Sequence, residues 1–232
     1  MTTTGDVQAF NDSSLNPPVR GFLHRPEHRP EHRPQNGAST GLVLTHGAGS
    51  NSNSPLLITV AGAFASAGFT VLRCDLPYRQ NRPYGPPRPG ASEQDRDGLR
   101  NAVAALRKLG CERMFLGGHS YGGRQATMLC AVEPDLVAGL MLLSYPLHPP
   151  RKPAQLRVQH LPQLQVPALF VHGTRDPFGS IDEMQSALKL IPAKTELLKV
   201  DGAGHDLGFN AKSMPDELVG EVVRAFQGFF GK

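Results

Sequence analysis

The stretch Gly117-Gly118-His119-Ser120-Tyr121-Gly122-Gly123 follows a short apolar run and precedes a proline-free stretch rich in alanine, methionine and leucine. It contains the pattern Gly-X-Ser-X-Gly centred on Ser120. Between a strand and a helix, this pattern forms a sharp turn, because glycines let neighbouring backbone approach closely. The turn presents a hydroxyl at a helix N-terminus, where backbone N–H groups favour negative charge. We therefore predict that Ser120 is a nucleophile. The alternative, a plain glycine-rich turn, is disfavoured by the strand–turn–helix context.

Short apolar runs and helical patterns alternate on both sides of this turn. Six runs are predicted as strands: 41–45, 69–74, 113–117, 138–144, 167–171 and 195–200. A helical signal follows five of them, and only the proline-rich segment 144–164 has no clean period. Such alternation indicates an α/β fold with a mostly parallel central sheet and helices on both faces. We expect residues 1–232 to form a single domain, because this length suits one large domain.

Local signals predict where several helices begin and where further strands lie. Four helix signals are the pair Ser54-Pro55, the apolar stripe from Leu99 to Leu109, the capping box Ser180 to Glu183 and the start Ser213 to Asp216. Two additional strand candidates lie at 7–10 and 19–23. Parallel sheets covered by helices bind ligands at the carboxyl ends of their strands, so the loops after the apolar runs are the place to search for a site.

A serine nucleophile needs a base, and His205 is the best placed of the nine histidines. It lies in a glycine-rich loop after the last apolar run and before the last helix. Asp176 follows the run 167–171 and gives the chain order Ser…Asp…His that this fold uses, so we predict that it orients the imidazole. Asp201, at a strand end close to His205, is the alternative acid. The alternative for His205 itself is a solvated loop histidine.

The loop after the first run, Thr45-His46-Gly47-Ala48-Gly49-Ser50, contains several small residues that let a backbone N–H approach the serine. We predict that the N–H groups of Ala48 and Tyr121 form an oxyanion hole. The same residues also suit a tight glycine turn, and the two interpretations are compatible.

From about Gly41 to the C-terminus the chain resembles the α/β-hydrolases. The turn His46-Gly47, the elbow at Ser120, the turn from His172 to Asp176 and the loop Gly204-His205 stand in that family's order.

Two short segments, Leu76 to Arg79 and Ser144 to Pro150, resemble those of small, nearly cap-less bacterial hydrolases within this family. That subgroup is similar to dienelactone-hydrolase-like proteins and to a eukaryotic chromatin-complex subunit with a hydrolase-like domain. Dienelactone hydrolases proper use a cysteine nucleophile, whereas this chain has Ser120. The segment 144–164 is too short for a lid domain, so we expect a minimal cap and an open, shallow site.

The leading hypothesis is a serine hydrolase of carboxylic esters or related acyl compounds. Ser120 attacks, His205 acts as base and then acid, and Asp176 orients His205. A small-molecule acyl substrate is expected, with no metal and no organic cofactor. Two alternatives stay open, a non-catalytic scaffold that kept the fold, and a peptidase or thioesterase.

The loop after the second run carries Arg79, Arg82 and Arg88 among several prolines. This loop should hang over the site, and its guanidinium groups could bind a substrate carboxylate or phosphate. The alternative is a solvated rim without a binding role.

Composition argues against several classes of partner. The formal net charge is only +4, and lysines and arginines form no block of the kind that binds nucleic acid. The first residues do not resemble a signal peptide, and no apolar stretch is long enough to span a bilayer. The three cysteines have no metal-ligand spacing. We expect a cytoplasmic protein that binds neither nucleic acid nor membrane, and the oligomeric state is left open.

A tetrapeptide repeat, His-Arg-Pro-Glu, runs from His24 to Pro34. Proline at every fourth position excludes a helix and a central strand. Three evenly spaced histidines could also be interpreted as a metal-binding tract. We expect an exposed, extended loop over residues 24–36.

Overall fold

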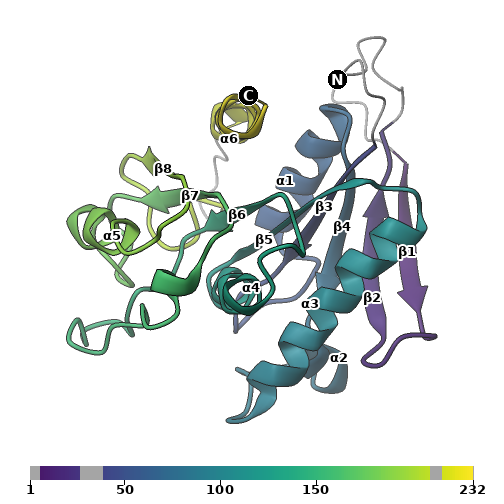
Figure 1. The fold of residues 1–232 in the computed structure, drawn as a ribbon, viewed down its shortest axis with the longest axis horizontal. Coiled ribbons are helices and arrows are strands. Elements are labelled where there is room, and N and C mark those ends of the chain that lie inside the picture. The colour runs from purple at the N-terminus through teal and green to yellow at the C-terminus, as the bar shows by residue number, and fades with distance from the viewer. Residues whose placement is uncertain (1–5, 27–38, 210–215, 232) are drawn as a thin grey trace.

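A computed structural model of the chain describes residues 6–26, 39–209 and 216–231, and its centre is an eight-stranded sheet (Figure 1). The strand order is β1-β2-β4-β3-β5-β6-β7-β8. At one edge β1 (Val7–Asp12) and β2 (Val19–His24) pair antiparallel, and β2 also runs antiparallel to β4. The other pairings are parallel. The predicted α/β class with a mostly parallel sheet is therefore confirmed.

The six parallel strands coincide with the six apolar runs to within two residues at either end. They are β3 (Thr40–Thr45), β4 (Thr70–Asp75), β5 (Arg113–His119), β6 (Gly139–Leu143), β7 (Ala168–Gly173) and β8 (Thr195–Val200). Most residues of β3 to β7 are buried, as expected of strands covered on both faces.

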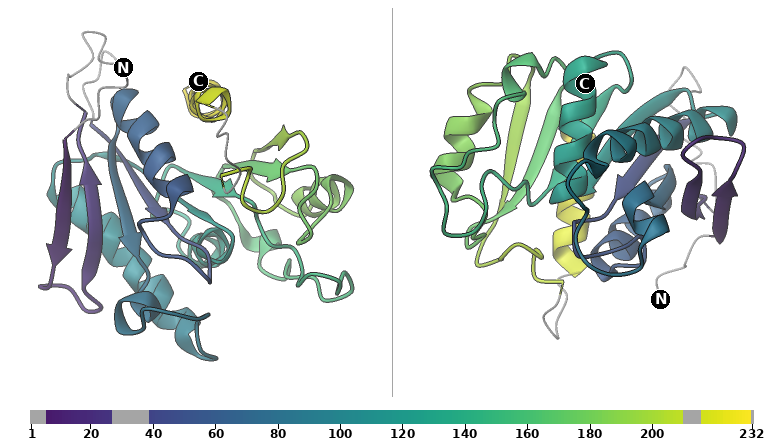
Figure 2. Two further views of the ribbon diagram at one scale, coloured as in Figure 1. Left: turned by 180° about the vertical axis from the view of Figure 1, so that it is seen from behind. Right: turned by 90° about the horizontal axis from the view of Figure 1, so that it is seen from below.

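Helices cover both faces of the sheet (Figures 1 and 2). On one face α1 (Pro55–Ser66) and α6 (Asp216–Phe230) contact each other and share an apolar core with the sheet. On the other lie α3 (Ala91–Lys108), α4 (Tyr121–Val132) and α5 (Ile181–Leu188). Two predicted caps are present, since Ser54 accepts from Leu57 N–H and Ser180 forms a capping box with Glu183. The predicted start at Ser213 lies outside the described residues.

The segment between β6 and β7 is short and irregular. Within residues 144–164, all of which the structure describes, the one helical element is a 3₁₀ turn, η1 (Leu161–Gln163). This segment makes at most the minimal cap expected from the sequence.

One short helix was not predicted. Residues expected to lie in a loop after β4 form α2 (Pro77–Asn81), which begins with a proline at its first position. The helix buries Pro77, Tyr78 and Arg79. Five residues are too few to show a helical period, which is why the sequence pattern did not indicate it.

The expectation of an exposed loop from His24 is wrong at its first residue. His24 ends β2 and is only 3% exposed, and its Nε2 accepts a hydrogen bond of 2.8 Å from Arg73 Nε on β4. Residues 27–38, which include the rest of the repeat, lie outside the described residues. In the described ranges, no helix has the length and apolar character needed to cross a membrane.

The burial of His24 makes stability depend on pH. Burial, assisted by the charge of Arg73, lowers the pKa of His24 to about 4. In the unfolded chain a histidine binds a proton near pH 6.5. The unfolded state therefore binds more protons between these values, and the stability that neutral His24 contributes is lost as the pH falls from about 6.5 to about 4.

We predict that His24→Gln makes the acid-induced loss of stability shallower. Glutamine can accept the Arg73 hydrogen bond through its amide oxygen but does not titrate. The measurement is the free energy of unfolding in urea at steps from pH 7 to pH 4, for the variant and the wild-type chain. Identical slopes in the two proteins would contradict a neutral, buried His24.

Candidate active site

Ser120 stands at the carboxyl end of β5, directly before α4, with a backbone φ of 51°. Positive φ is unfavourable for a residue with a side chain, and it persists only where the surroundings enforce it. Close packing does so here. A Cβ on Gly118 would lie 2.8 Å from Gly123 N, and one on Gly122 would lie 2.6 Å from the His46 carbonyl oxygen. The glycines of the motif are therefore required by contact, and the predicted elbow is present.

Three residues far apart in the sequence form a continuous hydrogen-bond chain at this point. His205 Nε2 lies 2.8 Å from Ser120 Oγ, and His205 Nδ1 lies 2.8 Å from Asp176 Oδ2. The Asp176 side chain is fully buried, whereas that of His205 is 20% exposed. A carboxylate accepts only, so Nδ1 carries the proton and Nε2 is left to accept from the serine hydroxyl.

Asp176 is fixed by its own turn. Its Oδ1 accepts from Phe178 N–H at 2.8 Å, which leaves Oδ2 for the imidazole. The alternative acid, Asp201, is exposed, and its Oδ1 accepts from Thr174 Oγ1 at 3.3 Å. The geometry thus brings the predicted acid, rather than its rival, to His205.

Two further residues hold His205, and sequence reasoning did not find them. The Phe178 ring stacks on the imidazole with ring centroids 4.0 Å apart. His119 Nε2–H donates to the His205 carbonyl oxygen at 2.8 Å. Burial lowers the pKa of His119 to about 4, so this histidine is neutral at pH 7 and serves as a donor without charge. His119 and His205 are 86 positions apart, and no local pattern signals such a contact.

The predicted oxyanion donors lie on two elements that meet at the elbow. Tyr121 is the first residue of α4, so its N–H has no partner within the helix. On the other side, Gly47 packs against the elbow, since a Cβ there would lie 2.9 Å from His119 Nδ1 and 3.4 Å from Ser120 Cβ. Ala48, the next residue, is half-buried. The role of both N–H groups stays a prediction.

The structure gives Arg79 a use other than the predicted one. Arg79 is 6% exposed, and its guanidinium donates to four backbone carbonyls, those of Ala48, Ser50, Arg82 and Gly85. These bonds use four of the five N–H donors of its guanidinium, and the predicted role of Arg79 in anion binding stays a prediction. Arg82 and Arg88 are exposed, and their proposed role in anion binding stays a prediction.

No metal centre is evident in the described parts of the chain, where His, Cys, Asp and Glu side chains form no group of three suited to an ion. The three cysteines are buried and free of disulfides.

Residues 38–229 match the family described as alpha/beta hydrolase domain, which is most of the chain. The chain belongs to this α/β-hydrolase family.

Solved structures similar to this α/β-hydrolase share its fold at low sequence identity. A dienelactone hydrolase from Anabaena variabilis is 21% identical, with a TM-score of 0.72 and coverage of 99% of this chain and 98% of that one. A serine hydrolase without a lid from Xanthomonas campestris is 15% identical, with a TM-score of 0.67 and coverage of 100% and 99%. Est1E from Butyrivibrio proteoclasticus is 16% identical, with a TM-score of 0.71 and coverage of 97% and 99%. The resemblance inferred from the motifs is confirmed at the level of family and fold.

Proposed function

We propose that this α/β-hydrolase is a serine hydrolase that cleaves carboxylic esters or related acyl compounds through an acyl-enzyme. The observation that carries the proposal is the unbroken hydrogen-bond chain from buried Asp176 through His205 to Ser120. A non-catalytic scaffold has no need to keep three such distant residues in hydrogen-bond contact. These hydrogen bonds therefore also favour an enzyme over a scaffold.

The geometry supports an ordered transfer of one proton. Ser120 Oγ attacks the acyl carbon while His205 Nε2 takes its proton, and the neighbouring carboxylate of Asp176 stabilises the imidazolium. The negative charge that develops on the acyl oxygen is bound by the N–H groups of Ala48 and Tyr121. His205 then protonates the leaving group, and water repeats the sequence to release the acid.

The proposed substrate is a small acyl compound that enters an open site. Support comes from the short segment 144–164, which contributes no lid, and from the lidless serine hydrolase and the dienelactone hydrolase among the similar structures. We further propose that the enzyme works in the cytoplasm without a metal or organic cofactor. The buried, unpaired cysteines are compatible with a reducing compartment.

We predict that Ser120→Ala, His205→Ala and Asp176→Asn each lower kcat by about 10⁴-fold or more, and that their combination lowers it little further. The three groups act as one unit, so the first loss removes most of the effect. The measurement is steady-state hydrolysis of neutral p-nitrophenyl esters of increasing acyl length.

Asp201→Asn is the matched control, because Asp201 is the alternative acid that the sequence offered, and this variant should retain wild-type kcat. A fluorophosphonate probe provides a second readout and should label the wild type but not Ser120→Ala. If Asp176→Asn remained fully active while Asp201→Asn did not, the assignment of the acid would be overturned. Equal labelling of the wild type and Ser120→Ala would support a scaffold instead.

A separate prediction concerns the two exposed loop arginines. If Arg82 and Arg88 bind a substrate anion, replacing both with glutamine should raise KM for an acidic ester and leave a neutral ester of equal size unchanged. The effect should shrink with added salt, because both side chains are exposed. An equal change in KM for the two esters would show that the loop only shapes the entrance of the site. An unchanged KM for both would show that the two arginines are solvated and have no binding role.

A further inference from the structure

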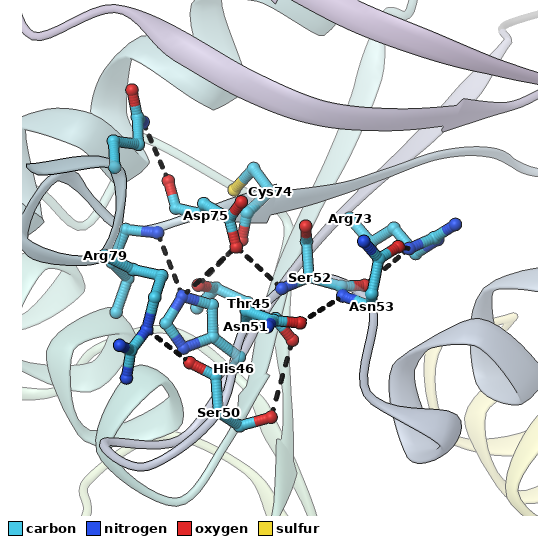
Figure 3. Close-up of polar contacts among 12 residues, drawn as sticks. Thr45, His46, Ser50, Asn51, Ser52, Asn53, Arg73, Cys74, Asp75 and Arg79 are labelled. Atoms are coloured by element: carbon cyan, nitrogen blue, oxygen red, sulfur yellow. Dashed lines mark hydrogen bonds and ion pairs between the residues drawn. The ribbon is translucent and has the colours of Figure 1, made fainter. Parts of the chain in front are cut away.

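A buried polar network surrounds the loop between β3 and α1, residues 46–54, which carries the proposed oxyanion donor Ala48. Figure 3 shows that its partners come from the end of β4 and from α2. Asp75 Oδ1 accepts from Ser52 N–H at 2.7 Å, and His46 Nε2 accepts from Leu76 N–H at 3.1 Å. The loop is therefore fixed by the last residue of β4 and by the backbone just after it, as well as by bonds within the loop.

Arg79 forms hydrogen bonds with this loop at two points. Its Nε donates to the Ser50 carbonyl at 2.7 Å, and its Nη2 donates to the Ala48 carbonyl at 3.1 Å. Among the described residues it has no ion pair with a carboxylate. A buried cation is normally paired, because desolvation of a charge is costly. Here its charge is instead distributed over four neutral backbone carbonyl groups, two of which belong to this loop.

Tyr78, the neighbouring residue of α2, also forms hydrogen bonds with this loop. Its hydroxyl lies 2.9 Å from the Ala48 carbonyl oxygen and 3.2 Å from that of Gly47, which also accepts from His46 Nδ1 at 2.8 Å. In a trans peptide the C=O and the following N–H point in opposite directions. Holding the Gly47 carbonyl toward Tyr78 and His46 therefore turns the Ala48 N–H the other way, out of this network.

We propose that Arg79, together with Tyr78, is a positioning residue for the oxyanion hole. The two side chains fix the peptide planes on either side of Ala48, and the unpaired charge of Arg79 favours negative charge on the acyl oxygen bound there. This inference rests on the proposed function, since it assigns a task to the loop only if Ser120 performs acyl transfer. It predicts an effect on the transition state, where the charge develops, and little effect on binding of the neutral substrate.

The chain offers a matched control in Arg73, the other buried arginine that holds this loop. Arg73 is 5% exposed and donates through Nη1 to the Ser52 carbonyl and to Asn53 Oδ1. It also stacks over the Phe22 ring at 4.1 Å. Its contacts lie where the loop enters α1, away from Ala48. Arg73 and Arg79 therefore have similar burial and both donate to carbonyl groups of this loop, but they hold different ends of it. Arg73 in addition donates to His24 Nε2.

The experiment compares Arg79→Gln with Arg73→Gln. We expect both to lower the free energy of unfolding, because each removes buried hydrogen bonds to carbonyl groups. Only Arg79→Gln should lower kcat for a neutral ester, by about 10- to 100-fold, with KM within about twofold of wild type, since small misplacements of an oxyanion donor have effects of this size. Arg73→Gln should keep kcat within about threefold.

Two further variants keep the test decisive if Arg79→Gln fails to fold. Tyr78→Phe removes only the hydroxyl and should lower kcat by several-fold at unchanged KM. Arg79→Lys keeps the charge but cannot reach all four carbonyls, and should recover part of the kcat lost in Arg79→Gln. Affinity for a trifluoromethyl ketone, which forms an anionic adduct with Ser120, should fall in parallel with kcat.

Three results would overturn the inference. The first is an equal fall of kcat in Arg79→Gln and Arg73→Gln. The second is a rise of KM for acidic esters alone, which would restore substrate binding by Arg79. The third is an unchanged kcat in Tyr78→Phe and Arg79→Gln beside an active wild type. A wild-type protein that neither hydrolyses esters nor reacts with the fluorophosphonate would instead overturn the proposed function itself.

Discussion

The carboxyl edge of the sheet is organised around the backbone of Ser120, which is held at a φ of 51°. Such a conformation costs about 1–3 kcal/mol and requires surroundings that leave no alternative. Those surroundings are contacts in which no side chain fits, between the end of β3, the elbow and the first turn of α4. The same contacts bring Gly47 against Ser120, so the strained nucleophile and the loop that faces it result from one packing arrangement. The hydroxyl, its base and the neighbouring donors then follow from where the parallel strands end.

Much of this arrangement could be predicted because its signals are local. Strands appear as apolar runs, the starts of α1 and α5 as Ser54 and Ser180 caps, and the elbow as glycines around a serine. His205 and Asp176 could be chosen because both follow strands, and the carboxyl ends of parallel strands meet at one edge. Asp176 and Asp201 both follow strands and both lie between Ser120 and His205, so chain order alone did not separate them. The 2.8 Å contact between Asp176 Oδ2 and His205 Nδ1 now supports Asp176.

The contacts that the sequence did not reveal involve polar residues whose partners are distant in sequence. Arg79 looked like a free cation in a proline-rich loop, yet it donates to carbonyls 29 and 31 positions earlier. His24 looked like the start of an exposed repeat, yet it accepts from Arg73, 49 positions later. Composition and periodicity indicate which apolar side chains are buried, but they do not indicate which polar side chain will find carbonyl groups or a neutral imidazole inside the fold. A short proline-led helix such as α2 also lacks the length to reveal a period.

Asp95 shows why this buried polar chemistry belongs to the site and not only to stability. It is fully buried on α3, its Oδ1 accepts from Tyr78 N–H at 3.0 Å, and its Oδ2 accepts from the Tyr121 hydroxyl at 2.8 Å. Burial raises the pKa of Asp95 and raises the pKa of Tyr78 to about 12, so both tyrosines remain protonated donors at neutral pH. One carboxyl group thus ties α2, which grips the loop at Ala48, to the first residue of α4, which follows Ser120. Because a buried polar group is costly without its partners, neither element can shift without leaving a donor or acceptor unsatisfied. Asp95 therefore holds both the loop at Ala48 and the elbow at Ser120 in place. The distance between the two proposed oxyanion donors, Ala48 and Tyr121, then depends on α3 as well as on the motif around Ser120.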